Sequence, residues 1–421
     1  MKKLLTTFGI FLILIFSACT SLEQESMSSE VILNETTEVN ITPEIPEILS
    51  EEEEEEEELT EIILEEEKEE EIIEELSAEE QAWEKRIDAA LAPSYCFAVE
   101  GPRYGDEYYT GPLIDTHYHI ANIPDSDPLG DDDEEEKSEE PTLGVNIKIA
   151  DIICTLEQEN TAKVFAFFPV YPEIPEQMIE VVSRTMKKYP EQFVPFIMPP
   201  DHDNDPQGFP TVDAAEFEDM LSIYPGLFEG YGEIGLYARE GGAKELPPDS
   251  ERLLEIYPVL RENNLVVYFH LGEGQQEAFE KVAQDNPDIH FIWHGDQLVE
   301  NGNDLETLEE ILYNNPNVYY GVDELYGDEW MIRPDKTKEE FLAYLEDYED
   351  LLKEDWRTWK GFIQRHPDQV IWGTDRSDQV LWSHEPETGI ALTNYARVFI
   401  AGLDEDVQEK FAYKNAEKLL E

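Results

Sequence analysis

Basic residues are scarce in this sequence of 421 amino acids. It holds 29 Lys and Arg against 99 Asp and Glu, which gives a formal net charge of −70. Residues 1–100 carry 5 basic and 29 acidic side chains, a net of −24, and residues 101–421 carry 24 and 70, a net of −46. Because a strongly negative surface repels phosphate backbones and anionic lipid headgroups, the composition disfavours nucleic acid as a partner.

Cysteine is also rare, with only Cys19, Cys96 and Cys154 in the chain. Three cysteines are too few for a disulfide framework. A bridge between Cys96 and Cys154 is possible in an oxidising compartment. However, 57 residues lie between them and nothing in the sequence fixes their geometry. We therefore expect two free thiols.

No apolar run is long enough to span a membrane as a helix. The longest, residues 4–16, follows two lysines and holds about 13 residues, against about 20 for a spanning helix. It precedes the small pair Ser17-Ala18 and then Cys19, which is the order of a signal peptide. The stretch Phe16-Ser17-Ala18-Cys19 resembles the lipobox of bacterial lipoproteins. This resemblance implies that residues 1–18 are removed, that Cys19 is lipidated, and that the protein is extracytoplasmic and anchored to the membrane through that lipid only. Ordinary secretory cleavage and an uncleaved anchor remain alternatives.

Glutamate dominates the segment that follows the signal peptide. Residues 51–58 are an unbroken run of Glu, and like charges in a block repel one another and extend the chain. Apolar residues in 61–91, among them Trp83 and Ile87, are spaced for one side of a helix. The sequence thus predicts a signal peptide (1–18), a disordered acidic tether that is partly helical (19–100), and a folded domain (101–421).

From residue 105 the chain alternates short apolar segments with amphipathic ones. The expected strands are Leu113–His117, Val164–Phe168, Val194–Met198, Gly230–Leu236, Leu265–Leu271, Ile289–His294, Val318–Val322 and Val370–Thr374. Expected helices between them include Pro175–Lys188, Asp213–Ile223, Asp249–Asn263 and Gln275–Asn286. This alternation predicts an α/β fold with a parallel sheet and helices outside it. Eight units over roughly 300 residues suit a closed (β/α)₈ TIM barrel. An open doubly wound sheet is the alternative, but no Gly-rich phosphate fingerprint follows an early strand.

Two insertions follow strand ends. Pro124–Gly144 comes after the first expected strand, and Tyr326–Pro367 comes after the seventh and contains a helical pattern over Thr337–Arg365. Both would lie on the face of a barrel that carries active sites, so each is a candidate lid. An acidic disordered loop is the alternative for the first.

Imidazole and carboxylate side chains stand at or near the ends of five expected strands. They are His117, His119, Glu233, His270, His294 and Asp375. Because residues i and i+2 of a strand point to the same side, His117 and His119 both face the barrel mouth and could bind one ion. A single buried histidine is most often structural, but six such side chains in one order favour a shared site.

The order His-x-His, Glu, His, His and Asp on strands 1, 4, 5, 6 and 8 resembles the metal-dependent amidohydrolase superfamily, over roughly residues 108–421. The resemblance implies one or two divalent cations. The first ion would be held by His117, His119 and Asp375, and the second by His270 and His294, with Glu233 between them. Mononuclear relatives instead use His117, His119, His270 and Asp375, with His294 contacting the substrate and no need for Glu233. Zn²⁺ is the favoured ion, and Mn²⁺, Fe²⁺ and Ni²⁺ are compatible with these ligands.

Such a site predicts a metal-dependent hydrolase that acts on a small-molecule amide, lactone or ester. A bound ion lowers the pKa of water towards about 7. Asp375 would accept the proton, and His294 is the second candidate catalytic residue. The stretch Gly232–Leu236 also resembles TatD-type deoxyribonucleases, although the acidic domain is poorly suited to a polyanion. Related mononuclear barrels are decarboxylases, and a binding protein without catalysis is a third alternative.

Other residues near the expected strand ends have structural interpretations. We expect Asp296 and Asp323 to cap helices or form turns, and Arg376 to form a salt bridge. Trp293 and Trp372 are expected in the core. Surface positions are expected for His202, His290, His366 and His384.

Overall fold

The computed structural model describes residues 77–120, 147–201, 208–239, 243–295, 305–323, 325, 335–376 and 380–421. These residues belong to one compact unit. The expected signal peptide, Cys19, residues 19–76 of the tether, the Pro124–Gly144 insertion, His202 and Asp296 lie outside them. No helix in the described part of the chain is both long and apolar enough to cross a bilayer.

Eight parallel strands form one sheet in chain order. They are β1 (Ile114–His119), β2 (Lys163–Pro169), β3 (Phe193–Met198), β4 (Gly230–Gly235), β5 (Val266–His270), β6 (Phe291–Trp293), β7 (Val318–Val322) and β8 (Val370–Trp372). The sheet closes where the Arg376 carbonyl, just after β8, accepts a hydrogen bond of 3.1 Å from the His119 amide on β1. This confirms the predicted (β/α)₈ barrel, with strand ends that differ from the expected ones by at most two residues.

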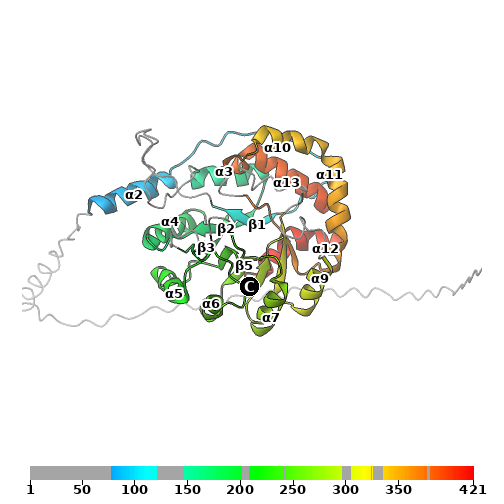
Figure 1. Ribbon diagram of the computed structural model, residues 1–421. Helices are drawn as coiled ribbons and strands as arrows, with labels where there is room; N and C mark the ends of the chain where they lie inside the picture. The colour runs from blue at the N-terminus through cyan, green and yellow to red at the C-terminus, as the bar shows by residue number, and fades with distance from the viewer. Residues whose placement is uncertain are drawn as a thin grey trace, which may run out of the picture. The chain divides into compact units, whose positions relative to one another are not determined.

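The helices surround the sheet (Figure 1). The α-helices are α2 (Ala78–Ala90), α3 (Ile149–Glu159), α4 (Pro175–Lys188), α5 (Ala214–Ile223), α6 (Glu251–Glu262), α7 (Gln276–Asp285), α9 (Leu305–Asn314), α10 (Lys338–Tyr344), α11 (Tyr348–Asp355), α12 (Gly361–Arg365), α13 (Pro386–Ala401), α14 (Glu405–Glu409) and α15 (Asn415–Lys418). Shorter helical turns are η3 (Leu345–Asp347), η4 (Trp356–Lys360), η5 (Leu381–His384) and η6 (Lys410–Lys414). The expected helix at Pro175–Lys188 is confirmed; its first residue is a proline, which suits a helix start, and its last two are lysines, which suit a helix end.

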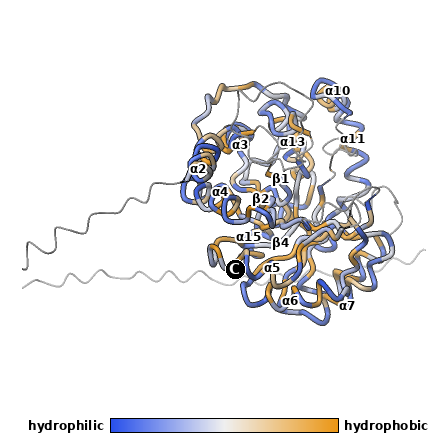
Figure 2. Tube along the Cα trace, turned by 60° about the vertical axis from the view of Figure 1, so that its left-hand side comes forward, coloured by the Kyte–Doolittle hydropathy of each residue, from blue (hydrophilic) through white to orange (hydrophobic). Residues whose placement is uncertain are grey.

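Two groups of buried side chains divide the core. One fills the barrel and includes Phe165, Phe167, Phe196 and Tyr268 from neighbouring strands. The other lies between the outer face of the sheet and the helices. Both faces of each strand are therefore buried, which is why the strands are continuous apolar runs. Polar and apolar residues alternate along helices such as α6 and α7 (Figure 2). This pattern arises because only one side of each helix faces the sheet.

The end of the chain closes the lower opening of the barrel. Ala416 and Leu419 belong to the apolar group inside the barrel. The Asn415 side-chain amide donates hydrogen bonds to the carbonyls of Pro367 and Val370, at 2.9 and 2.8 Å. Apolar side chains from the end of the chain therefore fill this end of the barrel.

The helical insertion after β7 covers the predicted range, but not as one regular helix. From Lys338 to Arg365 it runs through α10, η3, α11, η4 and α12, with a 3₁₀ turn and a π turn interrupting the α-helix. Earlier in the chain, the helix expected within residues 61–91 is present as α2. Its residues Ile87 and Ala90 are buried, and Glu84 pairs with Arg184 of α4 at 2.7 Å. Residues 77–90 therefore pack on the barrel helices.

A disulfide joins Cys96 to Cys154 on α3, so the expectation of free thiols is wrong. The two Cα atoms lie 5.4 Å apart. Hydrogen bonds on either side of the disulfide hold the two segments together. The Val99 amide donates to the Gln158 side chain at 2.7 Å, and the Ser94 hydroxyl donates to the Asp151 carboxylate.

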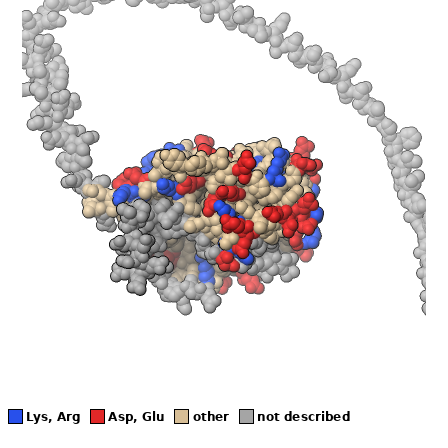
Figure 3. Space-filling view, turned by 90° about the horizontal axis from the view of Figure 1, so that it is seen from above, with Lys and Arg blue, Asp and Glu red and all other residues tan. Residues whose placement is uncertain are grey.

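The surface around the barrel carries many acidic side chains. Figure 3 shows one face of it.

Candidate metal centre

The predicted site residues converge at the upper mouth of the barrel. His117 and His119 are on β1, Glu233 is on β4, and His270 is the last residue of β5. His294 follows β6 directly, and Asp375 comes three residues after β8. The structure therefore brings all six together, and groups of them could hold a metal ion.

Four side chains form the tightest group, which we call the four-atom cage: Nε2 of His117, Nε2 of His119, Oε2 of Glu233 and Oδ1 of Asp375. His117 Nε2 lies 3.1 Å from His119 Nε2, 3.3 Å from Glu233 Oε2 and 3.1 Å from Asp375 Oδ1. His119 Nε2 lies 3.1 Å from Glu233 Oε2 and 3.5 Å from Asp375 Oδ1. Glu233, which the resemblance made the least certain ligand, is part of this group.

A second group adjoins the cage through the other oxygen of Glu233. Its Oε1 lies 2.9 Å from His270 Nδ1. The ring of His294 lies 4.4 Å, centroid to centroid, from the rings of both His117 and His270. His294 Nε2 is also 3.6 Å from Asp375 Oδ2. Glu233 thus lies between the cage and the pair His270 and His294.

Asp323, expected to cap a helix or form a turn, instead lies at the centre of the site. It follows β7 and is 2 % exposed. Its Oδ2 lies 3.3 Å from His117 Nδ1 and 3.6 Å from His294 Nε2, and it accepts a 3.2 Å hydrogen bond from the Tyr268 hydroxyl. A single Asp at a strand end has the same local sequence in either role, so only its position after β7 could have indicated the site.

Buried hydrogen bonds hold the ends of β1 and β8 in register. Asp115 Oδ1 accepts from the amides of His117 and Thr374, at 3.1 and 3.0 Å, and its Oδ2 accepts from the Thr374 hydroxyl at 2.5 Å. Arg376 forms a fully buried ion pair with Glu159 of α3, at 2.8 Å, which confirms the predicted salt bridge. These bonds fix the backbone on both sides of Asp375.

Two glycines make room at the site. Gly232 has a φ of 125°, and a Cβ there would lie 2.4 Å from the Tyr268 carbonyl oxygen. A Cβ on Gly373 would lie 2.2 Å from Asp323 Oδ1 and 2.8 Å from His117 Cβ. A side chain at either position would therefore displace the neighbouring strand or site residues.

Opposite charges dominate the ionisation of the cage. Burial lowers the pKa of His117, but the carboxylates of Asp375 and Asp323 outweigh it and raise the pKa to about 10. For His119, burial is likewise outweighed by Asp375 and Glu233, and the pKa rises to about 9. Burial alone would raise the pKa values of Glu233 and Asp375, yet the neighbouring imidazoles hold both well below their usual range. Without a cation, the cage consists of two imidazolium and two carboxylate groups at neutral pH.

The distances in the cage suit a divalent cation. Ligands about 2.0–2.1 Å from a tetrahedral Zn²⁺ stand about 3.3–3.4 Å from one another. The five distances given above run from 3.1 to 3.5 Å. Mixed imidazole and carboxylate ligands are compatible with Zn²⁺, Mn²⁺, Fe²⁺ or Ni²⁺. The residues therefore fit a metal ion.

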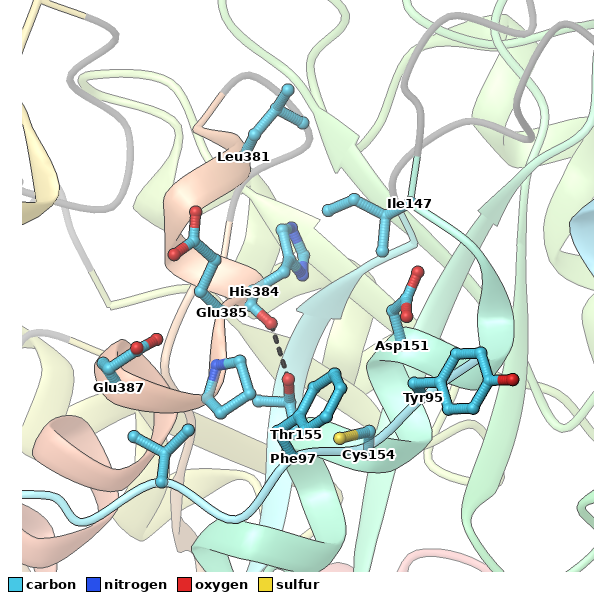
Figure 4. Close-up of a pocket in the computed structure, with 12 residues that line it drawn as sticks. Tyr95, Phe97, Ile147, Asp151, Cys154, Thr155, Leu381, His384, Glu385 and Glu387 are labelled. Carbon is cyan, nitrogen blue, oxygen red and sulfur yellow. Dashed lines mark hydrogen bonds between the residues drawn. The ribbon is translucent and has the colours of Figure 1, made fainter. Parts of the chain in front are cut away.

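The remaining predictions concern residues away from this cluster. Trp293 and Trp372 are buried, as expected for the core. His290 and His366 are half-buried. His384 is buried rather than on the surface, and its Nδ1 lies 2.9 Å from the Tyr118 hydroxyl. His384 lines a cavity of about 510 Å³ between α3 and η5. Tyr95 and Phe97 also line this cavity (Figure 4).

Fold and site together define a (β/α)₈ barrel enzyme with a histidine–carboxylate cluster at the C-terminal ends of its strands. The amidohydrolase family model matches residues 114–421. The chain belongs to this family, and it is an enzyme of the metal-dependent hydrolase type. No curated protein matches the chain.

Several solved structures resemble the protein. An amidohydrolase from Burkholderia multivorans with bound zinc is 11 % identical, with a TM-score of 0.46, over 74 % of this chain and 99 % of that one. A dihydroxybenzoic acid decarboxylase from Polaromonas with bound manganese and an inhibitor, 2-nitroresorcinol, is 11 % identical, with a TM-score of 0.42, over 74 % and 97 %. A 4-oxalomesaconate hydratase from Rhodopseudomonas palustris is 14 % identical, with a TM-score of 0.43, over 73 % and 95 %.

Proposed function

We propose that the protein hydrolyses an amide, lactone or ester bond of a small molecule with the help of one or two divalent cations, Zn²⁺ first among them. His117, His119, Glu233 and Asp375 would hold the first ion. His270 and His294, with Glu233 between the two positions, would hold a second. The observation that carries the proposal is the four-atom cage, in which five distances between ligand atoms run from 3.1 to 3.5 Å, close to those around one tetrahedral ion.

The chain's own groups would do three things in the reaction. A cation in the cage supplies acidity to water near neutral pH and polarises a carbonyl oxygen. Asp375 presents a second oxygen, Oδ2, beyond the cage and 3.6 Å from His294 Nε2, so the two can pass a proton between water and leaving group. His117 and His119, whose charges help to hold the pKa of Asp375 low, would each give up a proton in order to bind the cation.

Metal analysis and turnover together test this proposal. We expect the purified full chain to contain Zn²⁺, to lose turnover of a responsive ester, lactone or amide after chelation, and to regain it when Zn²⁺ is returned. Asp375→Asn should lower kcat by about 10²–10⁴ fold, because it removes the proton acceptor. Asp368→Asn is the matched control, since Asp368 pairs with Lys410 away from the mouth. Turnover that survives both chelation and Asp375→Asn would contradict the proposal.

Decarboxylation by a single ion is the second candidate. It is favoured by one observation: within the described residues, the cage offers four converging ligand atoms, whereas the other two possible metal groups offer three each. Hydrolysis incorporates an oxygen atom from water into the product, and decarboxylation releases CO₂ without it. Reaction in ¹⁸O-labelled water, combined with the number of ions per chain, therefore distinguishes the two. The TatD-like phosphodiesterase alternative has no support beyond the stretch Gly232–Leu236.

We further propose that the protein works outside the cytoplasm, tethered by a lipid on Cys19. The support is the lipobox-like stretch before Cys19 and the disulfide between Cys96 and Cys154, since such bonds persist in oxidising compartments. Cys19→Ser should release the protein from the membrane fraction. Membrane association that is unchanged in Cys19→Ser would contradict the lipid anchor.

A further inference from the structure

The two ring nitrogens of His117 face different partners. Its Nε2 belongs to the four-atom cage. Its Nδ1 faces away from the cage, 3.3 Å from Asp323 Oδ2 and 3.2 Å from the Tyr268 hydroxyl. His117 is fully buried, so its ring has no solvent to supply these contacts. Whatever holds Nδ1 therefore determines which way Nε2 points.

We propose that Asp323, supported by Tyr268, is a positioning residue that holds His117 in the tautomer and orientation required for cation binding. The inference rests on the proposed metal site. A neutral imidazole carries one ring proton, and a carboxylate next to Nδ1 keeps that proton on Nδ1. The lone pair of Nε2 is then directed at the cage. Carboxylates that accept the second N–H of a metal-bound histidine fix the ring and make it a stronger ligand.

Tyr268 fixes the carboxylate in turn. Its hydroxyl donates a 3.2 Å hydrogen bond to Asp323 Oδ2, the same oxygen that faces His117. The three groups form a closed triangle of contacts in which Asp323 is the acceptor.

The surrounding backbone is shaped around Asp323. A Cβ on Gly321, two residues earlier on β7, would lie 2.9 Å from Asp323 Oδ2. A Cβ on Gly373, beyond β8, would lie 2.2 Å from Asp323 Oδ1. Glycine at both positions leaves the carboxylate space between two strands. Because Asp323 contacts Nδ1 of His117 and the cage contacts Nε2, its role differs from that of a cage ligand.

Zinc affinity is the measurement that tests the proposal. The probe is Zn²⁺ titrated into the metal-free full chain against a chromophoric chelator. We expect Asp323→Asn to weaken binding of the first ion by about 10-fold or more, within the range found when such partners of metal ligands are removed. Tyr268→Phe should weaken it by a smaller factor, because the carboxylate remains but loses its donor.

A control variant comes from another buried Asp–Tyr pair. Asp355, at the end of α11, accepts a 2.5 Å hydrogen bond from Tyr395 of α13 and belongs to none of the possible metal groups. Asp355→Asn should leave Zn²⁺ affinity unchanged, even if it lowers the stability of the metal-free protein. A second readout is the ¹H–¹⁵N spectrum of histidine-labelled zinc protein. The Nδ1 proton of His117 should be visible far downfield in the wild type and should shift in Asp323→Asn.

The outcomes separate the possibilities. Wild-type protein that binds no Zn²⁺ overturns the proposed function itself. Wild-type binding with unchanged affinity and an unchanged Nδ1 signal in Asp323→Asn overturns only the positioning role. A loss of one bound ion per chain in Asp323→Asn also overturns it, because Asp323 would then be a ligand. If Asp323→Asn does not fold, Tyr268→Phe decides: lowered affinity supports the proposal, and unchanged affinity overturns it.

Discussion

Cation binding at the four-atom cage should release protons. The pKa values of His117 and His119 are raised to about 10 and about 9 by the surrounding carboxylates. Near pH 7.5 both rings are therefore protonated in the metal-free protein, while a metal ligand must be neutral. Adding Zn²⁺ to the metal-free protein should displace two protons per ion.

The magnitude follows from those two pKa values. Each released proton contributes about 1.4 kcal/mol to the binding free energy per pH unit, so two protons make affinity rise about 100-fold per pH unit. The dependence should hold up to about pH 9, weaken to about 10-fold per unit between 9 and 10, and vanish above that. Calorimetric titration in two buffers of different ionisation enthalpy measures the protons directly. Release of fewer than one proton per ion near pH 7.5 would refute the reasoning.

The stability of the metal-free protein should change with pH in the opposite direction. Both rings have folded-state pKa values above the usual 6.5 of an unfolded histidine. Their contribution to the free energy of unfolding is therefore complete below about pH 6.5 and is lost as pH rises through 9 and 10. Urea unfolding of the metal-free protein at pH 7 and pH 10 checks this sign. Greater stability at pH 10 would contradict the ionisation assigned to the cage.

Three further predictions concern the structure around the site. Glu159→Gln should destabilise the fold by about 3–5 kcal/mol in urea unfolding, because it leaves a buried guanidinium without its charge partner; a loss below about 1 kcal/mol would count against the ion pair. Reduction of the disulfide between Cys96 and Cys154, 58 residues apart, should lower stability by about 4 kcal/mol on a chain-entropy basis and lower Tm; an unchanged Tm would contradict this. Gly373→Ala should weaken Zn²⁺ affinity, since its Cβ would displace the Asp323 side chain. Unchanged affinity would contradict this, because the neighbouring strands would then move apart without disturbing the site.

The sequence was sufficient to predict the barrel because its strands are buried on both faces. A run such as Val318–Val322 is buried throughout, and its predicted and observed bounds agree. The paired His117 and His119 were also predictable, since a strand's two-residue period places them on one side. Their convergence with His270 and Asp375 followed from the order of strand ends in a barrel.

The features that the sequence did not predict depend on contacts between distant segments. Asp323 looks like a cap, and its part in the site depends on Tyr268 from β5 and on the space left by Gly373. His384 looks like a surface residue, and it is buried because Tyr118, on the outer side of β1, reaches its ring. The disulfide needed two segments 58 residues apart to be placed side by side. Local spacing contains none of this information.

The charges of the cage explain how one set of residues can be stable with and without a cation. In the metal-free protein, two imidazolium groups face two carboxylates, so the four side chains sum to zero. A divalent cation that displaces the two protons leaves two neutral imidazoles, two carboxylates and two positive charges, which again sum to zero. Burying an uncompensated charge is costly, and the four cage side chains avoid it among themselves in both states, with buried Asp323 beside them 3.3 Å from His117 Nδ1. The cage can therefore form during folding before a cation arrives, and cation binding then exchanges one compensating charge for another without rearranging the strands.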